Sequence, residues 1–349
     1  MFPAVQRSRF TELTRRYPTL RLAILGDFCL DRYLDIDPVL AETSIETGLP
    51  VHNVTGVRSL PGAAGTIMNN FLALGVGHIH AIGFCGRDGE GYELQRALRA
   101  SGRVHFDGFI ETPHRRTFTY TKPLVHEPGV PPRELSRLDL KNWTPTPEEV
   151  SRKIVGALRA VADEVDAIMV MDQVDVAESG VVTAPVRAAL GELAAARPKL
   201  PILADSRRSL RDWPPLIFKM NRQELGALLG RDLREVSAVP DAALDLARVN
   251  RRPVFITLAE HGMVGADPGG PSPDDDAVVH RAPALPIRGP IDIVGAGDSV
   301  SANLTAALAA GAEVPEALAL ASAAASVAIH QLGTTGAASV EDLEGLAVE

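Results

Sequence analysis

The chain of 349 residues is 46% hydrophobic and has a formal net charge of −9, from 35 Lys and Arg against 44 Asp and Glu. This much apolar sequence can bury a large core, which excludes disorder as the main description. The negative charge argues against a nucleic-acid partner, because binding to a phosphate backbone depends on clustered Lys and Arg that displace counterions. We therefore expect a small-molecule partner.

Cysteine content and hydropathy predict the compartment. The two cysteines, Cys29 and Cys85, are too few for a disulfide framework or a four-cysteine zinc site. Residues 1–20 contain four arginines and lack the apolar core of a signal peptide. No apolar run is long enough to span a bilayer. These features predict a cytoplasmic protein without a membrane segment.

Short apolar runs alternate with amphipathic segments along the first hundred residues. Residues 21–26 form a continuous apolar run followed by Asp27, which is typical of a buried parallel strand. Residues 33–60 are mixed, and the alternation at 51–57 suits the exposed strands of a small sheet. After it we expect a helix over 62–74, a strand over 79–83 and a helix over 89–100.

Two more strands without an intervening helix are predicted over 104–110 and 116–122, where they would complete the small sheet. Further strands are predicted over 167–171, 201–204, 216–220 and 254–258, and helices over 147–161, 181–196, 222–229, 241–249, 297–310 and 315–330. Residues 267–276 are acidic and rich in Gly and Pro, which predicts a surface loop. This alternation predicts an α/β fold with a doubly wound, mainly parallel sheet that carries helices on both faces.

The most informative local feature is Ile291–Ser299 (IDIVGAGDS), where glycines directly precede a helix. Glycine lets the backbone approach a ligand, and the free N–H groups and the helix dipole attract an anion. Asp298 lies in the first turn of this helix, where a carboxylate can be a plain dipole partner. It can also be a base that takes a proton from an alcohol while the amides hold phosphoryl oxygens. Both interpretations fit the local sequence.

Two other phosphate-binding motifs are excluded. The chain has no G-x-x-x-x-G-K-[ST] segment, so it is not a P-loop enzyme. The glycines at 295 and 297 lack the third glycine and the N-terminal strand of a dinucleotide fingerprint.

The segment Asp292–Ser299 resembles the D-T-x-G-A-G-D signature of the PfkB/ribokinase family of carbohydrate kinases. Other blocks agree in order and look most like the heptose-7-phosphate kinases of that family: 25–33 (LGDFCLDRY), 61–65 (PGAAG), 86–91 (GRDGEG), 220–224 (MNRQE) and 331–335 (QLGTT). The resemblance covers about residues 20 to 340. It implies a ribokinase-like fold in a single domain over 1–349, with segments 33–60 and 104–122 forming a small β-sheet lid that excludes water.

The resemblance also implies roles at matching positions for the phosphoryl group and the metal. Asp298 would be the general base, and the amides of Gly295, Ala296 and Gly297 would form the anion hole for the transferring γ-phosphoryl group of ATP. Asn221 and Glu224 match the N-x-x-E that holds Mg²⁺ and phosphates largely through water. The alternative for Asn221 is a simple cap of the following helix.

The remaining implied residues bind ATP or the sugar, and several depart from the family pattern. ATP would also contact Thr257, Gly262 and Arg207, and the sugar would contact Asp31, Gly62, Ala63, Thr66 and Asp172. The family has a Gly-Gly pair and a following Asn where this chain has Gly62-Ala63 and Thr66. An Asp-Pro-Lys of the heptose kinases is replaced by the segment 205–208 (DSRR), so that Arg207 is either a phosphate ligand or an ordinary exposed loop arginine.

We therefore expect a cytoplasmic ATP- and Mg²⁺-dependent kinase that phosphorylates a hydroxyl of a sugar or sugar phosphate and pairs as a homodimer. The altered segments leave open a catalytically inactive sugar- or nucleotide-binding regulatory protein. A nucleoside or vitamin kinase of the same fold is a second alternative, since fold does not determine substrate.

Overall fold

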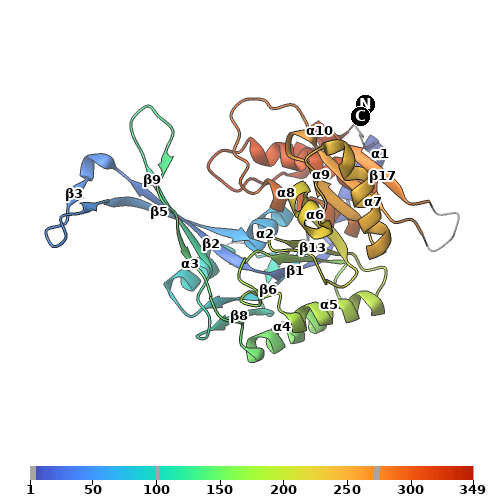
Figure 1. Cartoon of the computed structure of the whole chain (residues 1–349), viewed down its shortest axis with the longest axis horizontal. Coiled ribbons are helices and arrows are strands. Elements are labelled where there is room, and N and C mark those ends of the chain that lie inside the picture. The colour runs from blue at the N-terminus through green and yellow to red at the C-terminus, as the bar shows by residue number, and fades with distance from the viewer. Residues whose placement is uncertain (1–4, 100–101, 271–275, 349) are drawn as a thin grey trace.

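The computed structural model describes residues 5–99, 102–270 and 276–348, and two β-sheets organise it (Figure 1). The larger sheet contains β1 (Arg21–Gly26), β6 (His78–Gly86), β7 (Val104–His105), β8 (Phe109–Thr112), β12 (Ala167–Asp172), β13 (Ile202–Ser206), β14 (Ile217–Asn221), β15 (Val254–Thr257), β16 (Met263–Asp267) and β17 (Val278–Ala282). Their order is β17-β16-β15-β14-β13-β12-β1-β6-β7, with β8 also beside β6. Only the pairs β15–β16 and β16–β17 are antiparallel among these described strands.

The order of the strands reverses next to β1. The chain first winds from β1 to β6, and later returns to fill the other side of β1 with β12 and its neighbours. Strand β12 is buried along its whole length, and β1 is buried after its first residue, which explains their continuous apolar runs. Ligands of open α/β sheets bind at the carboxyl ends of the strands at such a reversal of strand order.

Helices pack on both faces of this sheet, as expected (Figure 1). One group contains α2 (Ala64–Ala73), α8 (Ala296–Ala309) and α9 (Val314–Ile329), and the other contains α4 (Glu148–Val161), α5 (Ala184–Ala196), α6 (Arg222–Leu229) and α7 (Val239–Asn250). The short helices α1 (Arg7–Thr14) and α10 (Val340–Ala347) lie near the chain ends, where Val5 and Val348 form a β-bridge. No helix in the described part of the chain is long and apolar enough to cross a membrane.

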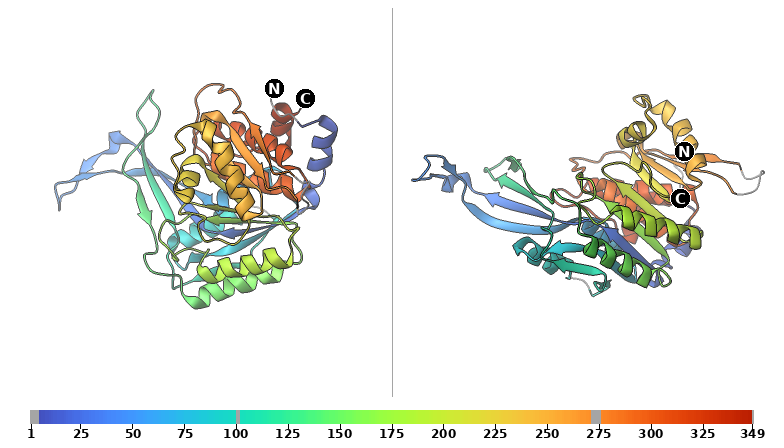
Figure 2. Two further views of the ribbon diagram at one scale, coloured as in Figure 1. Left: turned by 45° about the vertical axis from the view of Figure 1, so that its right-hand side comes forward. Right: turned by 60° about the horizontal axis from the view of Figure 1, so that its bottom comes forward.

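The smaller sheet contains β2 (Phe28–Ile36), β5 (Val54–Ala63), β9 (Thr119–Val125), β10 (Arg133–Glu134) and β11 (Leu138–Leu140). It projects from the body, with α3 (Gly89–Leu98) against its base and the hairpin of β3 (Glu42–Thr43) and β4 (Pro50–Val51) toward its far end (Figures 1 and 2). Strand β2 follows β1 after the single residue Asp27, so one continuous stretch enters both sheets. This junction brings the two sheets together beside the carboxyl end of β1.

The expected lid segments need one correction. Residues 104–112 do not join the smaller sheet, because β7 and β8 pair in parallel with β6 in the larger one. The second expected strand, 116–122, corresponds to β9 at Thr119–Val125, which pairs with β2 in the smaller sheet. The strand β2 itself begins at Phe28, five residues before the expected segment 33–60.

Most other expected elements are present with shifted ends. The helix expected from residue 62 begins at Ala64, because Gly62 and Ala63 complete β5. The helix expected from residue 181 begins at Ala184, after a loop held by buried polar contacts. Strands β16 and β17 were not predicted. The last residue of the helix expected over 89–100, and residues 271–275 of the expected loop, lie outside the described residues.

Candidate active site

A cavity of about 670 Å³ lies where the carboxyl ends of the central strands face the smaller sheet. Ten of the residues expected to form the site line it: Asp31, Ala63, Thr66, Arg207, Asn221, Glu224, Thr257, Gly295, Gly297 and Asp298. Four others, Gly62, Asp172, Gly262 and Ala296, do not line it. The cavity has the size of a small-molecule site and carries charged groups from several elements.

The start of α8 forms the expected anion cradle, but with a different set of free amides. Gly295 has φ 83° and packs against the Thr335 carbonyl so closely that a Cβ would lie 2.3 Å from its oxygen, so only glycine fits. The Ala296 N–H donates to the Ile293 carbonyl at 3.3 Å, so it is not free for a ligand. No backbone acceptor among the described residues takes the N–H groups of Gly297 and Asp298. These two donors therefore remain for an anion.

Asp298 lies in the first turn of α8, with its side chain partly exposed to the cavity. Burial raises the pKa of this carboxyl to about 7, and the negative charge of Asp205 adds to the effect. The positive charges of Lys219 and Arg207 oppose the rise. A carboxyl with this pKa is half ionised near neutral pH, which suits a general base.

Lys219 lines the cavity although it was not among the expected site residues. It lies on β14 and is 6% exposed, and its Nζ donates to Asp205 Oδ2 at 2.7 Å. The same Asp205 oxygen accepts a hydrogen bond from the Ser301 hydroxyl at 2.9 Å. The signal was a lysine inside the otherwise apolar strand residues 217–220, since a lysine is rarely buried without a specific partner.

Asn221 and Glu224 form the helix cap that was the alternative to a ligand role. The Asn221 side chain accepts from the Glu224 N–H at 2.9 Å, and Glu224 Oε2 accepts from the Asn221 N–H at 2.7 Å, which is a capping box for α6. Both side chains nevertheless line the cavity. Because the cap uses Oε2 of Glu224, its other oxygen remains available to a ligand.

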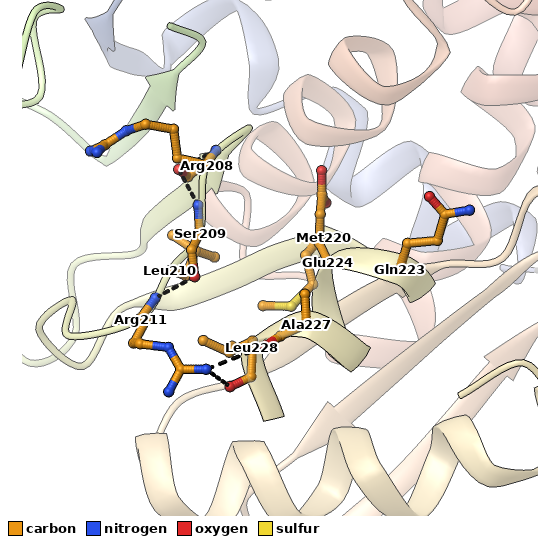
Figure 3. A pocket seen from close by; sticks show the side chains of 10 residues that line it. Arg208, Ser209, Leu210, Arg211, Met220, Gln223, Glu224, Ala227 and Leu228 are labelled. Carbon is orange, nitrogen blue, oxygen red and sulfur yellow. Dashed lines mark hydrogen bonds between the residues drawn. The ribbon is translucent and has the colours of Figure 1, made fainter. Parts of the chain in front are cut away.

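A second cavity of about 460 Å³ also has Glu224 in its lining (Figure 3). It is lined by Ser206, residues 208–211, Met220 and α6. The Arg211 guanidinium donates to the Ala227 and Leu228 carbonyls at the end of α6, so it fastens the loop to the helix. This contact holds the loop that carries Arg207 against the helix that carries Glu224.

The end of the cavity beneath the smaller sheet contains a buried ion pair. Lys122 on β9 lies 3.4 Å from Asp31 Oδ1 and donates to the Tyr33 hydroxyl at 3.2 Å. Burial raises the pKa of Asp31, although the Lys122 charge opposes the rise. Gly62 lies behind Asp31, because a Cβ at this position would be 2.6 Å from Asp31 Oδ2. Gly62 therefore makes room for Asp31 rather than lining the cavity.

Ala63 shows the consequence of departing from the family's glycine pair. Its backbone has φ 52° and ψ −114°, a region that glycine adopts freely and alanine rarely. The residue also lines the cavity. An alanine kept in this strained conformation therefore adds a methyl group to the wall of the site at an energetic cost.

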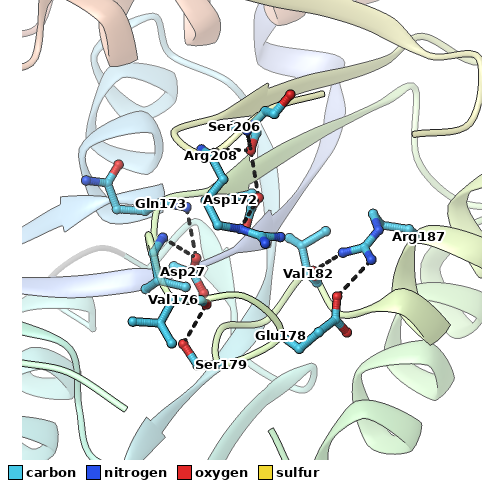
Figure 4. A network of polar contacts seen from close by, with 12 residues as sticks. Asp27, Asp172, Gln173, Val176, Glu178, Ser179, Val182, Arg187, Ser206 and Arg208 are labelled. Carbon is cyan, nitrogen blue, oxygen red and sulfur yellow. Dashed lines mark hydrogen bonds and ion pairs between the residues drawn. The ribbon is translucent and has the colours of Figure 1, made fainter. Parts of the chain in front are cut away.

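Asp172, which was expected to contact the sugar, has a buried side chain and does not line the cavity (Figure 4). It accepts a hydrogen bond from the Ser206 hydroxyl at 2.7 Å and lies 3.7 Å from the Arg208 guanidinium. Its neighbour Gln173 lines the cavity instead. Strand β12 ends at Asp172, so Gln173 belongs to the loop that follows, and this loop residue reaches the cavity.

Asp27 anchors the loop after β12 (Figure 4). Its carboxylate accepts from the N–H groups of Gln173, Val174 and Val181 at 2.9, 3.2 and 2.8 Å. Burial, reinforced by the Asp172 charge, raises the pKa of Asp27 against these hydrogen bonds. The loop residues Gln173 and Asp175 line the cavity, so Asp27 supports the site without reaching it.

The remaining expected nucleotide contacts differ in their placement. Thr257 ends β15 and lines the cavity, whereas Gly262 forms the turn into β16 with φ 85°. A Cβ at Gly262 would lie 2.1 Å from the Ala282 carbonyl oxygen, so packing requires this glycine. Arg207 is an exposed loop residue that also lines the cavity, and its guanidinium donates to Gln173 at 3.3 Å. No carboxylate among the described residues lies within ion-pair distance of Arg207, so an anionic ligand can pair with it.

Comparisons with known proteins identify the family of the chain. The model of the pfkB family carbohydrate kinases matches residues 28–341. Curated relatives include bifunctional proteins HldE of Pelobacter propionicus, 29% identical over 99% of this chain and 67% of that protein, and of Rhodospirillum rubrum, 30% identical over 93% and 61%. The chain thus spans about two thirds of the length of these relatives.

Solved structures show the same fold. Arabidopsis thaliana ribokinase, complexed with ribose and ATP, has a TM-score of 0.67 at 17% identity, and the match covers 94% of this chain and 98% of that one. Escherichia coli phosphofructokinase-2, in complex with substrates and products, has a TM-score of 0.67 at 18% identity with the same coverage. The ribokinase-like α/β fold expected from the sequence is confirmed. With the family model matching most of its length, the chain belongs to the pfkB family of carbohydrate kinases.

Proposed function

We propose that the protein uses ATP to phosphorylate a hydroxyl of a sugar or sugar phosphate, in a single kinase domain over 1–349. The observation that carries the proposal is Asp298, a carboxyl with a pKa of about 7 beside free amides at a helix N-terminus. The same cavity contains Asp31, a carboxylate able to accept hydrogen bonds from sugar hydroxyls. Base, anion cradle and acceptor contact therefore share one cavity.

In the proposed reaction the oxygen of the acceptor hydroxyl bonds to the γ-phosphorus of ATP, and Asp298 accepts the proton of that hydroxyl. The bond from this phosphorus to the bridging β–γ oxygen breaks, and ADP leaves. The N–H groups of Gly297 and Asp298, together with the positive end of α8, stabilise the charge on the transferring group. Thr257 and Arg207 would contact the rest of the nucleotide. Catalysis then consists mainly of positioning and charge stabilisation.

Magnesium would be held mostly by the nucleotide. Among the described residues no group of three or more His, Cys, Asp or Glu side chains is arranged to hold a metal ion. The free oxygen of Glu224, with Asn221 beside it, fits an ion that keeps several waters and takes phosphate oxygens as ligands. When bound, the ion would neutralise phosphate charge.

The smaller sheet would act as the lid over the acceptor. Its strands β2 and β9 supply Asp31, Tyr120 and Lys122 to the cavity. Closing this side excludes water, which protects ATP from hydrolysis.

The test is ADP release from ATP and Mg²⁺ over free hexoses, pentoses, heptose 7-phosphate, other sugar phosphates and nucleosides. We expect turnover on a member of the sugar or sugar phosphate groups. Free and phosphorylated sugars are both included because Lys122, Arg137, Lys141 and Arg207 all line the cavity. Turnover restricted to nucleosides would contradict the sugar assignment. Nucleotide binding without turnover on any member would favour a non-catalytic binding protein.

We also propose a homodimer that pairs through the smaller sheet. This sheet projects from the body and exposes Val54, Val57, Leu138 and Leu140, which a partner copy would cover (Figure 2). Light scattering after size exclusion should give twice 37.1 kDa at micromolar concentration. Val57→Asp combined with Leu138→Asp should shift the mass to that of one chain. A wild-type protein that stays monomeric would contradict this proposal.

A further inference from the structure

Lys219 is a buried cation next to the start of α8. Its Nζ lies 3.3 Å from the position where a Cβ on Gly297 would stand. The missing side chain at Gly297 therefore gives the ammonium access to the first turn of the helix. Asp205 accepts one of its three N–H donors. Since Lys219 lines the same cavity as Asp298, its other donors can face a ligand there.

Stability alone does not explain this arrangement. A positive charge beside a helix N-terminus opposes the helix dipole, which favours anions at that end. A buried ion pair is also weak evidence for stability, because well-packed apolar residues are often as stable. Lys219, the free N–H groups of Gly297 and Asp298, and the positive end of α8 all surround one part of the cavity. An anion in that place would be favoured by all three.

We propose that Lys219 binds the transferring phosphoryl group directly, and that Asp205 and Ser301 are positioning residues that hold its ammonium in place; this rests on the proposed kinase function. Lys219 donates hydrogen bonds to non-bridging oxygens of the γ-phosphoryl group. Asp205 balances the charge before nucleotide binds. Ser301 fixes the Asp205 oxygen from α8, the helix that also carries Asp298. These contacts hold the Lys219 ammonium at a fixed position relative to the Asp298 carboxylate.

The test compares Lys219→Met, Asp205→Asn and the double variant with wild type. The single Lys219→Met variant leaves Asp205 buried without its cation, which can impair folding. The double variant removes both charges while nearly preserving shape, so we expect it to melt within a few degrees of wild type. Lys153→Met is the matched control, because Lys153 is an exposed lysine of α4 whose ion pair among the described residues is with Glu149.

We expect the double variant to lose about 100-fold in kcat, as for a removed transition-state donor. By calorimetry its affinity for ATP should fall about 10-fold, as for a lost charge-assisted hydrogen bond. Its affinity for AMP should not change, because AMP lacks the γ-phosphoryl group. Lys153→Met should match wild type in each measurement.

The pH dependence of kcat/KM reports the charges that surround Asp298, and a lysine distant from the reacting atoms would not move it. Asp298 is faced by Asp205, Lys219, Arg207 and Asp31, and the positive end of α8. Lys219→Met removes a positive neighbour and should shift the acidic limb of the profile to higher pH. Asp205→Asn removes a negative neighbour and should shift it to lower pH.

Two failures are distinguishable. If wild type binds no ATP, the proposed function falls, and this inference falls with it. If wild type binds ATP and the double variant retains the wild-type ATP affinity and kcat, Lys219 is only structural and the inference alone is overturned. The inference would also be overturned if the acidic limb of the kcat/KM profile stayed at the wild-type pH in both Lys219→Met and Asp205→Asn.

Discussion

Asp298→Asn should lose about 100- to 10,000-fold in kcat while increasing the stability of the fold. Asparagine cannot accept the proton of the acceptor hydroxyl, and general-base removal has effects of about 10²–10⁴. Burial and Asp205 disfavour the ionised carboxyl, as the pKa of about 7 indicates. At pH 8 the wild-type protein therefore carries an unfavourable charge that asparagine lacks, and we expect a gain of about 1–2 kcal/mol in unfolding free energy.

The sign of the pH effect follows from the direction of this shift. The pKa of Asp298 is higher in the folded protein than in the unfolded chain, so its stabilising contribution is present at acid pH and is lost as pH rises through about 7. The stability difference between Asp298→Asn and wild type should therefore grow between about pH 4 and 7. Activity of the wild type should rise over the upper part of the same range, because the base must be ionised. Urea unfolding and kcat/KM, both measured from pH 5 to 9, check the two trends.

Asp241→Asn is the matched control. Asp241 occupies the third position of α7, as Asp298 does in α8, but it is exposed. Its removal should cost about 0.3–1 kcal/mol of stability, the usual value for an acidic side chain at a helix N-terminus, and should not change kcat. If Asp298→Asn behaves like Asp241→Asn in both respects, Asp298 is a plain dipole partner and the base has been assigned wrongly.

The order of strands and helices could be predicted because most elements are indicated by the pattern of their own residues. Strand β1 has its expected bounds, as does α6, whose ends are marked by Asn221 and the left-handed Gly230. The segments 104–112 and 119–125 look equally β-like but enter different sheets. Partner choice depends on contacts distant in sequence, which local patterns do not contain.

The site could be predicted where a motif fixes the backbone, and less well where side chains meet across strands. The glycines before α8 and the position of Asp298 follow from the local segment and its resemblance. Lys219 reaches the site only because Asp205 and Lys219 are register partners on adjacent strands. Asp172 ends β12 and is buried, whereas Gln173 begins the following loop and lines the cavity, a difference of one residue that the apolar run before them does not indicate.

Asp27→Ala should destabilise the protein by about 3–5 kcal/mol, the largest stability loss that we expect from a residue outside the cavity lining. The Asp27 carboxylate accepts three backbone N–H groups of the loop after β12, and alanine would leave these buried donors without acceptors. Gly180 lies against the same carboxylate, where a Cβ would be 2.6 Å from Asp27 Oδ1, so the loop is closely fitted to it.

Asp166→Ala is the control for this loss, because Asp166 also accepts a backbone N–H, that of Arg21, but at an exposed position. Water can replace that acceptor, so we expect a cost below about 1 kcal/mol. Urea unfolding at pH 7 measures both variants. A loss under about 1 kcal/mol for Asp27→Ala would mean that water or a shifted loop satisfies the three donors. Other contacts would then hold the loop in place, such as the hydrogen bond that the Thr146 hydroxyl donates to the Gly180 carbonyl.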